Sequence, residues 1–345
     1  SLLAAVRNGD DAVVERLLKR EQRPAALLEA VDAQGFTALH LAASAGREGW
    51  VRRLVAAGAA LDAGAGEKGD TPLIISCGAG QAGCARVLIE AGANVDERNR
   101  DGDGVTPLYI ACQMGHIDCA RLCLEAGANV QAAEENGATP LYIACYNGHT
   151  DCARLCLDAG ANVEAAMLDG ATPLYIACQN GHIDCARLLL EAGANVDAAL
   201  EEDCATPLFA ACQRGHTDCA RLCLEAGGNV EATKSDGATP LFAACQEGHI
   251  DCARLLLEAG ANTEAALKED GTTSLIIATD RGHLSIVQLL CFLHGANRAP
   301  PNTEDTAESV AEHAGHDDVL AWLQRTRDFT TPLHHLELLS AARTR

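Results

Sequence analysis

The stretch ATPLYIACQNGHIDCARLLLEAGANVD, residues 171–197, recurs with small changes along most of the chain. Its threonine marks the register, because an equivalent threonine returns every 33 to 35 residues. A fixed period of this length is the signature of a stacked repeat array. The opening block LLAAVRNGD (2–10) matches the same pattern without its threonine. The equivalent threonines are Thr37, Thr71, Thr106, Thr139, Thr172, Thr206, Thr239, Thr273 and Thr306.

Each repeat predicts two short helices. Thr106 can cap the first helix by accepting a hydrogen bond from its first turn, and Pro107 suits the first helical position, which needs no amide donor. Gly115 can take the left-handed conformation that ends this helix. Asp118 then lies in the first turn of the second helix, which Gly127 ends. Helices of about eight residues are too short to be stable alone in water, so the repeats must stabilise one another by stacking.

Three blocks carry a family resemblance: DGATPLYIACQNGHIDCARLLLEAGANV (169–196), TPLFAACQEGHIDCARLLLEAGAN (239–262) and FTALHLAASAGR (36–47). They resemble the ankyrin repeat, and the similarity extends over roughly residues 1–323. The resemblance implies an all-α repeat solenoid, an array of antiparallel helix pairs joined by β-hairpin-like fingers. It also implies a non-catalytic scaffold that binds a partner protein or peptide.

The repeats divide the chain into expected units. Residues 1–323 form the solenoid, and residues 324–345 are a C-terminal extension that resembles the start of a further, truncated unit. This ending, and a first residue that is Ser1 rather than Met, suggest a fragment of a longer protein. Within the solenoid we expect an N-terminal half-unit at 1–31, units near 32–65, 66–100, 101–133, 134–166, 167–200, 201–233, 234–267 and 268–300, and a C-terminal cap at 301–323.

Some residues depart from the family pattern. Cys204 replaces a glycine of the finger, and one extra residue near Cys291–His294 is expected to distort a second helix. His40 keeps the histidine usual in the family, whereas five other repeats carry an aromatic residue there. These aromatic side chains either pack where finger and helix meet or line a groove beside the fingers, and packing is the favoured alternative. They are Tyr109, Tyr142, Tyr175, Phe209 and Phe242.

The charge balance excludes two classes of partner. The 345 residues include 26 basic and 48 acidic side chains, a formal net charge of −22. Residues 61–270 hold 12 basic and 32 acidic side chains, a difference of −20. Nucleic acids and anionic membranes require a basic surface, so neither is an expected partner. No apolar run reaches the roughly 20 residues of a membrane span, so no direct membrane insertion is expected.

The cysteines predict packing rather than chemistry. Fifteen of the 17 fall at three fixed repeat positions, where a small apolar residue suits a core. Zinc would need four ligands converging on one point, usually with close pairs such as C-x₂-C, and this chain has no C-x₂-C pair. Cys112 and Cys119 of one repeat lie on adjacent helices, where oxidation could join them. The odd total and the lack of an N-glycosylation sequence favour a reducing compartment, the cytoplasm or the nucleus.

Other motifs are weak. The histidines after each helix-ending glycine, such as His116 and His149, are one repeat apart, too far to share a metal, and should bond within their own loops. Residues 64–69 match G-x-G-x-x-G, but the helix that follows is too short for a dinucleotide site. Residues 99–104 imitate a calcium loop, but Ile110 stands where a glutamate is needed. We therefore expect no metal, no cofactor and, because no catalytic motif is present, no enzyme activity.

Positions that vary between repeats can encode a partner, and in the family these lie at the finger tips and the exposed ends of the first helices. Tyr146 and Arg214 are favoured as anchors, because interface hot spots are rich in Tyr and Arg. Met167 and Leu168 place apolar side chains where solvation alone would not. The predicted partner-binding residues are Gln113, Met114, Asn136, Tyr146, Asn147, Met167, Leu168, Asp169, Gln179, Asn180, Glu202, Asp203, Gln213, Arg214, Gln246 and Glu247.

The acidic finger tips favour a basic protein or peptide as partner, with no nucleic acid involved and the chain itself monomeric. Two alternatives to a free-standing scaffold stay open. The chain could be the substrate-recognition arm of a larger enzyme, a ligase or kinase, whose catalytic domain lies outside these residues. It could also be an adaptor domain of a membrane channel.

Overall fold

The computed structural model describes residues 1–20, 24–100, 103–301, 303 and 305–327. Over these residues the chain forms 21 helices, none of which is long and apolar enough to cross a membrane. The chain divides into two compact units, residues 1–168 and 169–345.

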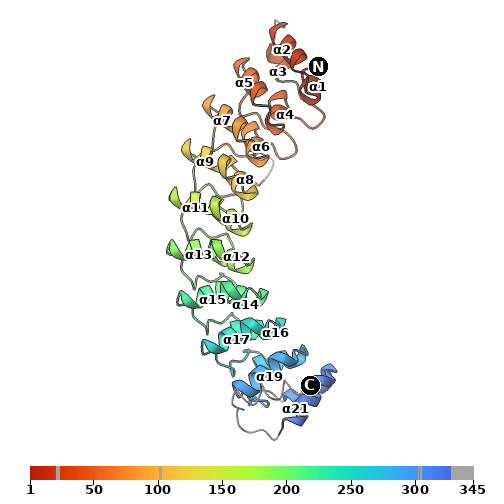
Figure 1. The fold of residues 1–345 in the computed structure, drawn as a ribbon, viewed down its shortest axis with the longest axis vertical. Coiled ribbons are helices and arrows are strands. Elements are labelled where there is room, and N and C mark those ends of the chain that lie inside the picture. Colours follow the sequence, from red (N-terminus) through yellow and green to blue (C-terminus); the bar gives the residue numbers. More distant parts are fainter. Residues whose placement is uncertain (21–23, 101–102, 302, 304, 328–345) are drawn as a thin grey trace, which may run out of the picture. The chain divides into compact units, whose positions relative to one another are not determined.

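Both units consist of consecutive helix pairs, which confirms the predicted solenoid. Within each unit, Figure 1 shows the first helices of the pairs in one layer and the second helices in another. The first unit contains α1 (Leu2–Asn8) with α2 (Asp11–Arg20), a short α3 (Pro24–Leu28), α4 (Ala38–Ser44) with α5 (Glu48–Ala56), α6 (Pro72–Gly78) with α7 (Ala82–Glu90), α8 (Pro107–Met114) with α9 (Ile117–Glu125), and α10 (Pro140–Tyr146) with α11 (Thr150–Asp158). The second unit contains α12 (Pro173–Gln179) with α13 (Ile183–Glu191), α14 (Pro207–Arg214) with α15 (Thr217–Glu225), α16 (Pro240–Glu247) with α17 (Ile250–Glu258), α18 (Ser274–Asp280) with α19 (Leu284–Leu293), and α20 (Ala307–Ala314) with α21 (Asp317–Arg325).

The predicted helix signals act as expected. Thr106 Oγ1 accepts a hydrogen bond from the Tyr109 amide at 3.2 Å, and Pro107 opens α8. Gly115 ends α8 with φ 72°, in the left-handed region, and Asp118 lies in the first turn of α9. In this repeat the first helix therefore begins and ends at residues that satisfy some of its free backbone groups.

The histidine after the helix-ending glycine bonds to the preceding repeat rather than to its own loop. In the second unit, His249 Nε2 lies 3.2 Å from the carbonyl oxygen of Gln213, and His283 Nε2 lies 3.1 Å from that of Gln246. In the first unit, a Cβ added to Gly115 would lie 2.6 Å from His149 Nδ1. Gly115 is therefore required both for its backbone conformation and for the approach of the next repeat's imidazole.

Small apolar side chains fill the interior between repeats. Leu108, Ala111 and Cys112 of α8 have no exposed surface, and the same positions are closed in the other central repeats. The aromatic residue of each repeat is also buried, with 6% of Tyr109 and 4% of Phe209 exposed. These five aromatic side chains are therefore packed in the interior, and Tyr109 in addition lines a cavity between finger tips and first helices.

The finger tips, defined here as the residues three to five positions before each anchor threonine, are joined by backbone hydrogen bonds. In the first unit the Glu135 amide donates to the Asp103 carbonyl at 2.9 Å, and the Leu168 amide donates to the Asn136 carbonyl at 3.0 Å. The second unit repeats the bond from Ser235 to Asp203 at 2.9 Å. One bond per repeat thus holds neighbouring finger tips in register.

The extra residue near Cys291–His294 changes the end of α19. This helix has ten residues, whereas α17 has nine. The Ala296 amide reaches back six residues to the Leu290 carbonyl, whereas Ala261 reaches back five residues to Leu256.

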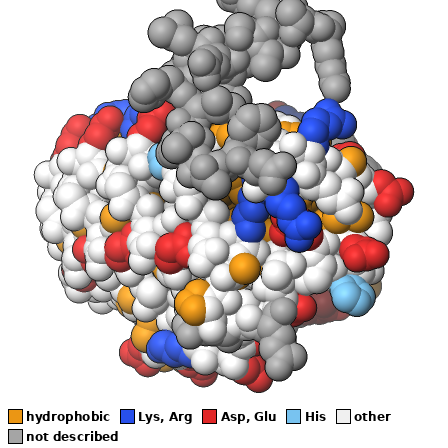
Figure 2. Space-filling model, turned by 90° about the horizontal axis from the view of Figure 1, so that it is seen from below, with side chains coloured by type: hydrophobic (Ala, Val, Ile, Leu, Met, Phe, Trp, Pro, Cys, Tyr) orange, Lys and Arg blue, Asp and Glu red, His pale blue; other side chains and the backbone are white. Residues whose placement is uncertain are grey.

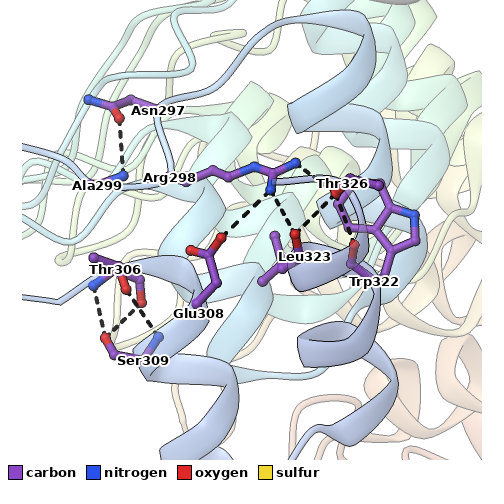
Figure 3. A network of polar contacts seen from close by, with 9 residues as sticks. All are labelled: Asn297, Arg298, Ala299, Thr306, Glu308, Ser309, Trp322, Leu323 and Thr326. Atoms are coloured by element: carbon purple, nitrogen blue, oxygen red, sulfur yellow. Dashed lines mark hydrogen bonds and ion pairs between the residues drawn. The ribbon is translucent and has the colours of Figure 1, made fainter. Parts of the chain in front are cut away.

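Arg298 holds the last helix pair in place (Figure 3). Its guanidinium donates to the Leu323 carbonyl at 3.0 Å and to Thr326 Oγ1 at 2.9 Å, at the C-terminal end of α21, where a cation is favourable. Glu308 of α20 lies 3.6 Å from Arg298, whose guanidinium carbon is 5.6 Å from the centre of the Trp322 ring. Of the predicted extension 324–345, residues 328–345 lie outside the described residues.

Cys204 adopts the backbone conformation of the glycine that it replaces. Its φ is 60°, and among the described residues it is the one non-glycine residue with positive φ. An L-residue in the left-handed region costs about 1–2 kcal/mol, because its Cβ approaches the carbonyl oxygen.

We predict that Cys204→Gly stabilises the chain by about 0.5–1 kcal/mol, since relief of this strain exceeds the added backbone entropy of glycine. Urea unfolding followed by circular dichroism would measure the change. Cys204→Ser keeps the Cβ and removes the thiol, so it should leave the midpoint nearly unchanged. An equal gain in both variants would attribute the effect to the thiol rather than to the backbone.

His40 is a buried neutral imidazole in the first unit. Its Nδ1 accepts from the Thr37 amide at 3.2 Å, and its Nε2 donates to the Ala63 carbonyl at 2.8 Å. Burial lowers the pKa of His40 below the ordinary histidine value, although its hydrogen bonds and the Asp70 and Asp32 carboxylates oppose this effect.

Because the pKa of His40 is lower in the folded than in the unfolded chain, the unfolded chain binds more protons in acid. The free energy of unfolding should therefore fall as the pH drops below about 6.5. Melting temperatures at pH 7.5 and 5.5 would measure this loss, which should be smaller in His40→Tyr, the side chain found at the matching Tyr109. Equal losses in the two proteins would show that His40 does not carry the effect.

Candidate functional site

None of the sixteen predicted partner-binding residues is buried. Eight are exposed, namely Met114, Asn136, Tyr146, Leu168, Asp169, Glu202, Arg214 and Glu247. The other eight are half-buried, namely Gln113, Asn147, Met167, Gln179, Asn180, Asp203, Gln213 and Gln246.

Three of these residues stand out as exposed large apolar side chains in the first unit. Leu168 is 75% exposed, Met114 51% and Tyr146 47%. Among the described residues, Val31 is the one other large apolar side chain with such exposure. In a chain whose interior is closely filled, three exposed apolar side chains at the predicted surface are the feature that most needs explaining.

Secondary structure fixes where these three side chains emerge. Met114 is the last residue of α8, and Tyr146 is the last residue of α10. Leu168 lies in a finger tip, where its amide is bonded to the Asn136 carbonyl. The backbone of all three is therefore held by helix or finger contacts, so their exposure is not the result of a frayed segment.

The predicted residues of the second unit are polar, and Asp203 among them forms an ion pair. Lys234 Nζ lies 2.9 Å from Asp203 Oδ2 and 5.4 Å from the centre of the Phe209 ring. Burial opposes the charge of Asp203, but the hydrogen bond from Lys234 and the Ala205 amide lower the pKa of this carboxyl below its usual value. Arg214 is exposed at the last position of α14.

Part of the acidity has a structural role that sequence reasoning missed. Asp96 Oδ1 accepts from the Asn129 amide at 2.8 Å, and Asp197 Oδ1 accepts from the Asn229 amide at 2.9 Å, each bond joining neighbouring repeats. Glu264 makes the same contact to the Asn297 amide at 2.9 Å. The signal was an acidic residue recurring 31 to 33 positions before an asparagine.

Charge alone consequently does not mark a binding site. Figure 2 shows acidic side chains spread over the face that it draws rather than gathered in one patch. A site must therefore be sought where charge coincides with shape or with exposed apolar surface.

A cavity of about 370 Å³ in the first unit meets this condition and was not predicted. It lies between finger tips and first helices, with Gly78, Ile110 and Tyr109 on its helix side and Asp103 and Glu134 on its finger side. Of the sixteen predicted residues, Gln113 lines it. The signal available in the sequence was Gly78, which stands where later repeats carry Gln113 or Tyr146.

The thiols make contacts between repeats rather than within one. Cys112 Sγ lies 3.6 Å from Cys156 Sγ, and Cys178 Sγ lies 3.6 Å from Cys223 Sγ. Cys112 thus meets a cysteine of the next repeat instead of Cys119. Hydrogen bonding to neighbouring thiols, together with burial, raises the pKa of Cys112 well above its ordinary value. In the described part of the chain, no three His, Cys, Asp or Glu side chains are placed to hold a metal ion.

We predict that a thiol reagent such as DTNB labels the native protein rapidly at Cys204, which is exposed, and slowly at the 15 buried cysteines. Cys291 is half-buried, and burial raises the pKa of its thiol to about 11, so it should react slowly as well. Unfolding in denaturant should release all 17 thiols. Cys204→Ser should remove the rapid phase, and a rapid phase that persists in this variant would contradict the packing described here.

Comparisons with known proteins agree with this geometry. The family model described as ankyrin repeats in three copies matches residues 49–134, 124–199 and 198–266, and the single ankyrin-repeat model matches residues 270–305. The crystal structure of the human ASB11 ankyrin repeat domain is similar with a TM-score of 0.56 and 32% sequence identity, and the match covers 61% of this chain and 92% of that chain. No match to a curated protein was found. Since the family models account for most of the sequence, the chain belongs to the ankyrin-repeat family.

Proposed function

We propose that the chain is a non-catalytic scaffold that binds a partner protein through its finger tips and the exposed ends of its first helices. Ankyrin repeats are in general protein–protein interaction modules. The observation that carries the proposal for this chain is the exposure of Met114, Tyr146 and Leu168 in one unit. These side chains lie at positions that vary between repeats and are not needed for stacking.

Burial of these apolar side chains by a partner would contribute to the free energy of binding. Covering an apolar side chain gains about 25 cal/mol for each Å² removed from water. A few such anchors carry most of the energy of a typical interface, and Tyr is among the residues enriched there. The Tyr146 ring in addition loses little conformational entropy on binding, because only two side-chain torsions must be fixed.

The partner that we propose is basic. The net charge of −20 over residues 61–270 attracts a cationic surface, and this attraction weakens as salt screens it. Binding by a chain with 15 buried cysteines outside any disulfide further suits a reducing compartment such as the cytoplasm.

The test is capture of a partner from a lysate of source cells, followed by affinity measurement with the purified partner. Replacement of Met114, Tyr146 and Leu168 by Ala should weaken binding about thirtyfold or more, the effect of losing one hot spot of about 2 kcal/mol. Val31→Ala removes an equally exposed apolar side chain outside the predicted surface, and it should leave affinity unchanged.

Circular dichroism of both variants would show that the fold is intact. Affinity should also decline as salt rises from 50 to 300 mM. A triple variant that binds every captured protein as tightly as the wild type would refute this surface.

A further inference from the structure

The unpredicted cavity of the first unit lies beside α6, which ends in smaller side chains than the first helix of the next repeat. Gly78 and Ala79 stand where the next repeat has Gln113 and Met114. A Cβ on Gly78 would lie 3.2 Å from Ile110 Cγ1, closer than most carbon contacts. Ile110 thus occupies the space next to Gly78, and a cavity of about 370 Å³ lies between α6, α8 and the finger tips. This volume exceeds that of a single long side chain.

The walls of the cavity differ in character. Ile75 and Ile110, both half-buried, provide apolar surface on the helix side, next to the buried Tyr109 ring. The finger side carries carboxylates. An aliphatic stem with a cationic end would match both walls, as lysine side chains do at apolar surfaces.

The charge of the lining is negative. The lining includes Asp70, Asp103 and Glu134 and one basic residue, Lys68, so the net charge of the lining residues is −2. The Glu134 oxygens are bound by amides of its own finger tip, Oε1 by the Asn136 amide at 3.0 Å. Asp70 Oδ1 accepts from the Asn99 side chain at 3.2 Å. Asp103 is exposed, and its carboxylate forms no ion pair with a described residue. The nearby Arg98 guanidinium donates instead to the carbonyl oxygens of Gly104 and Ala133, at 2.7 and 2.6 Å.

The second unit has a carboxylate and an aromatic ring at the positions of Asp103 and Tyr109, and there a cation lies between them. There Lys234 is held between the Asp203 carboxylate, at 2.9 Å, and the face of the Phe209 ring, at 5.4 Å. An ammonium group gains both from an ion pair and from the negative face of an aromatic ring.

The two places are equivalent in the repeat register. Asp103 and Asp203 stand three residues before their anchor threonines, and Tyr109 and Phe209 three residues after. The next finger tip supplies Lys234 in the second unit, but at the matching position of the first unit it supplies Glu134. The first unit thus keeps the acceptor and the ring but has a second carboxylate where the cation would be.

We propose that this cavity, which we name the Asp103 pocket, binds a lysine side chain from a basic segment of the partner protein. The lysine stem would lie on Ile75 and Ile110, and its ammonium group would take the place next to Asp103 and Tyr109 that Lys234 takes next to Asp203 and Phe209. The proposal rests on the proposed scaffold function and specifies one side chain that the partner must offer.

The titration of Tyr109 is consistent with an excess of negative charge. Burial raises its pKa to about 12, and the charges of Glu134 and Asp103 contribute in the same direction. Burial disfavours any charge, but the two carboxylates that disfavour the phenolate would favour a cation.

The test uses NMR of the full chain, with labelled isoleucine methyl groups and synthetic peptides as probes. The peptides are acetyl-Gly-Gly-Lys-Gly-Gly-amide and the same sequence with norleucine, whose side chain keeps the stem without the ammonium group. The lysine peptide should shift the Ile75 and Ile110 methyl signals in a saturable way. The norleucine peptide should bind at least about fivefold more weakly.

Asp103→Asn should weaken binding of the lysine peptide at least about fivefold, since it removes the charge and keeps the shape. The matched control is Asp203→Asn, because that carboxylate is already occupied by Lys234, and this variant should bind the peptide like the wild type. Glu134→Lys would provide an internal cation and should abolish binding; its melting temperature would show whether the finger survives the exchange.

Equal binding of the lysine and norleucine peptides, or no effect of Asp103→Asn, would overturn the Asp103 pocket. Neither result would contradict the proposed scaffold function, which is tested separately by the substitution of Met114, Tyr146 and Leu168. The reverse outcome is also distinguishable. If the lysine peptide binds the pocket but the Ala variant of Met114, Tyr146 and Leu168 still binds every partner, the proposed apolar surface is refuted and the Asp103 pocket is not.

Discussion

Within each of the two units, the structure depends on the close contact of each first helix with the first helices of the neighbouring repeats. Residues such as Ala111 and Cys112 have no exposed surface because the next helix covers them. A helix of seven or eight residues has too few internal hydrogen bonds to be stable alone. Its stability therefore comes from its neighbours, and the imidazole of His249 on the Gln213 carbonyl adds a polar bond to the same contact.

This dependence restricts which residues are free to vary. The anchor threonine, the helix-ending glycine, the histidine and the small core residues are all engaged in stacking or capping. Even acidic residues such as Asp96 hold the following repeat through an asparagine amide. What remains are the finger tips and the ends of the first helices, so a partner can be encoded there without loss of the fold.

Much of this could be predicted from the sequence, because the signals repeat and are local. Thr106, Pro107 and Gly115 mark one helix within ten residues, and Met114, Tyr146 and Leu168 are apolar where solvent is expected. Contacts one repeat away were harder to predict. The contact of Cys112 with Cys156 depends on how adjacent repeats are rotated, which no single repeat encodes. The Asp103 pocket likewise needs Gly78 and Glu134, 56 residues apart.

The cysteine-filled interior links folding to chemistry. In the native chain the buried thiols are shielded, whereas an unfolded chain would present all 17 of them in a single flexible segment. In an oxidising solution, disulfides formed at random among so many thiols would trap the chain before it could refold. Unfolding of this protein is therefore reversible only where reductant is plentiful, and its operational lifetime depends on the redox state of its surroundings as much as on the free energy of its fold.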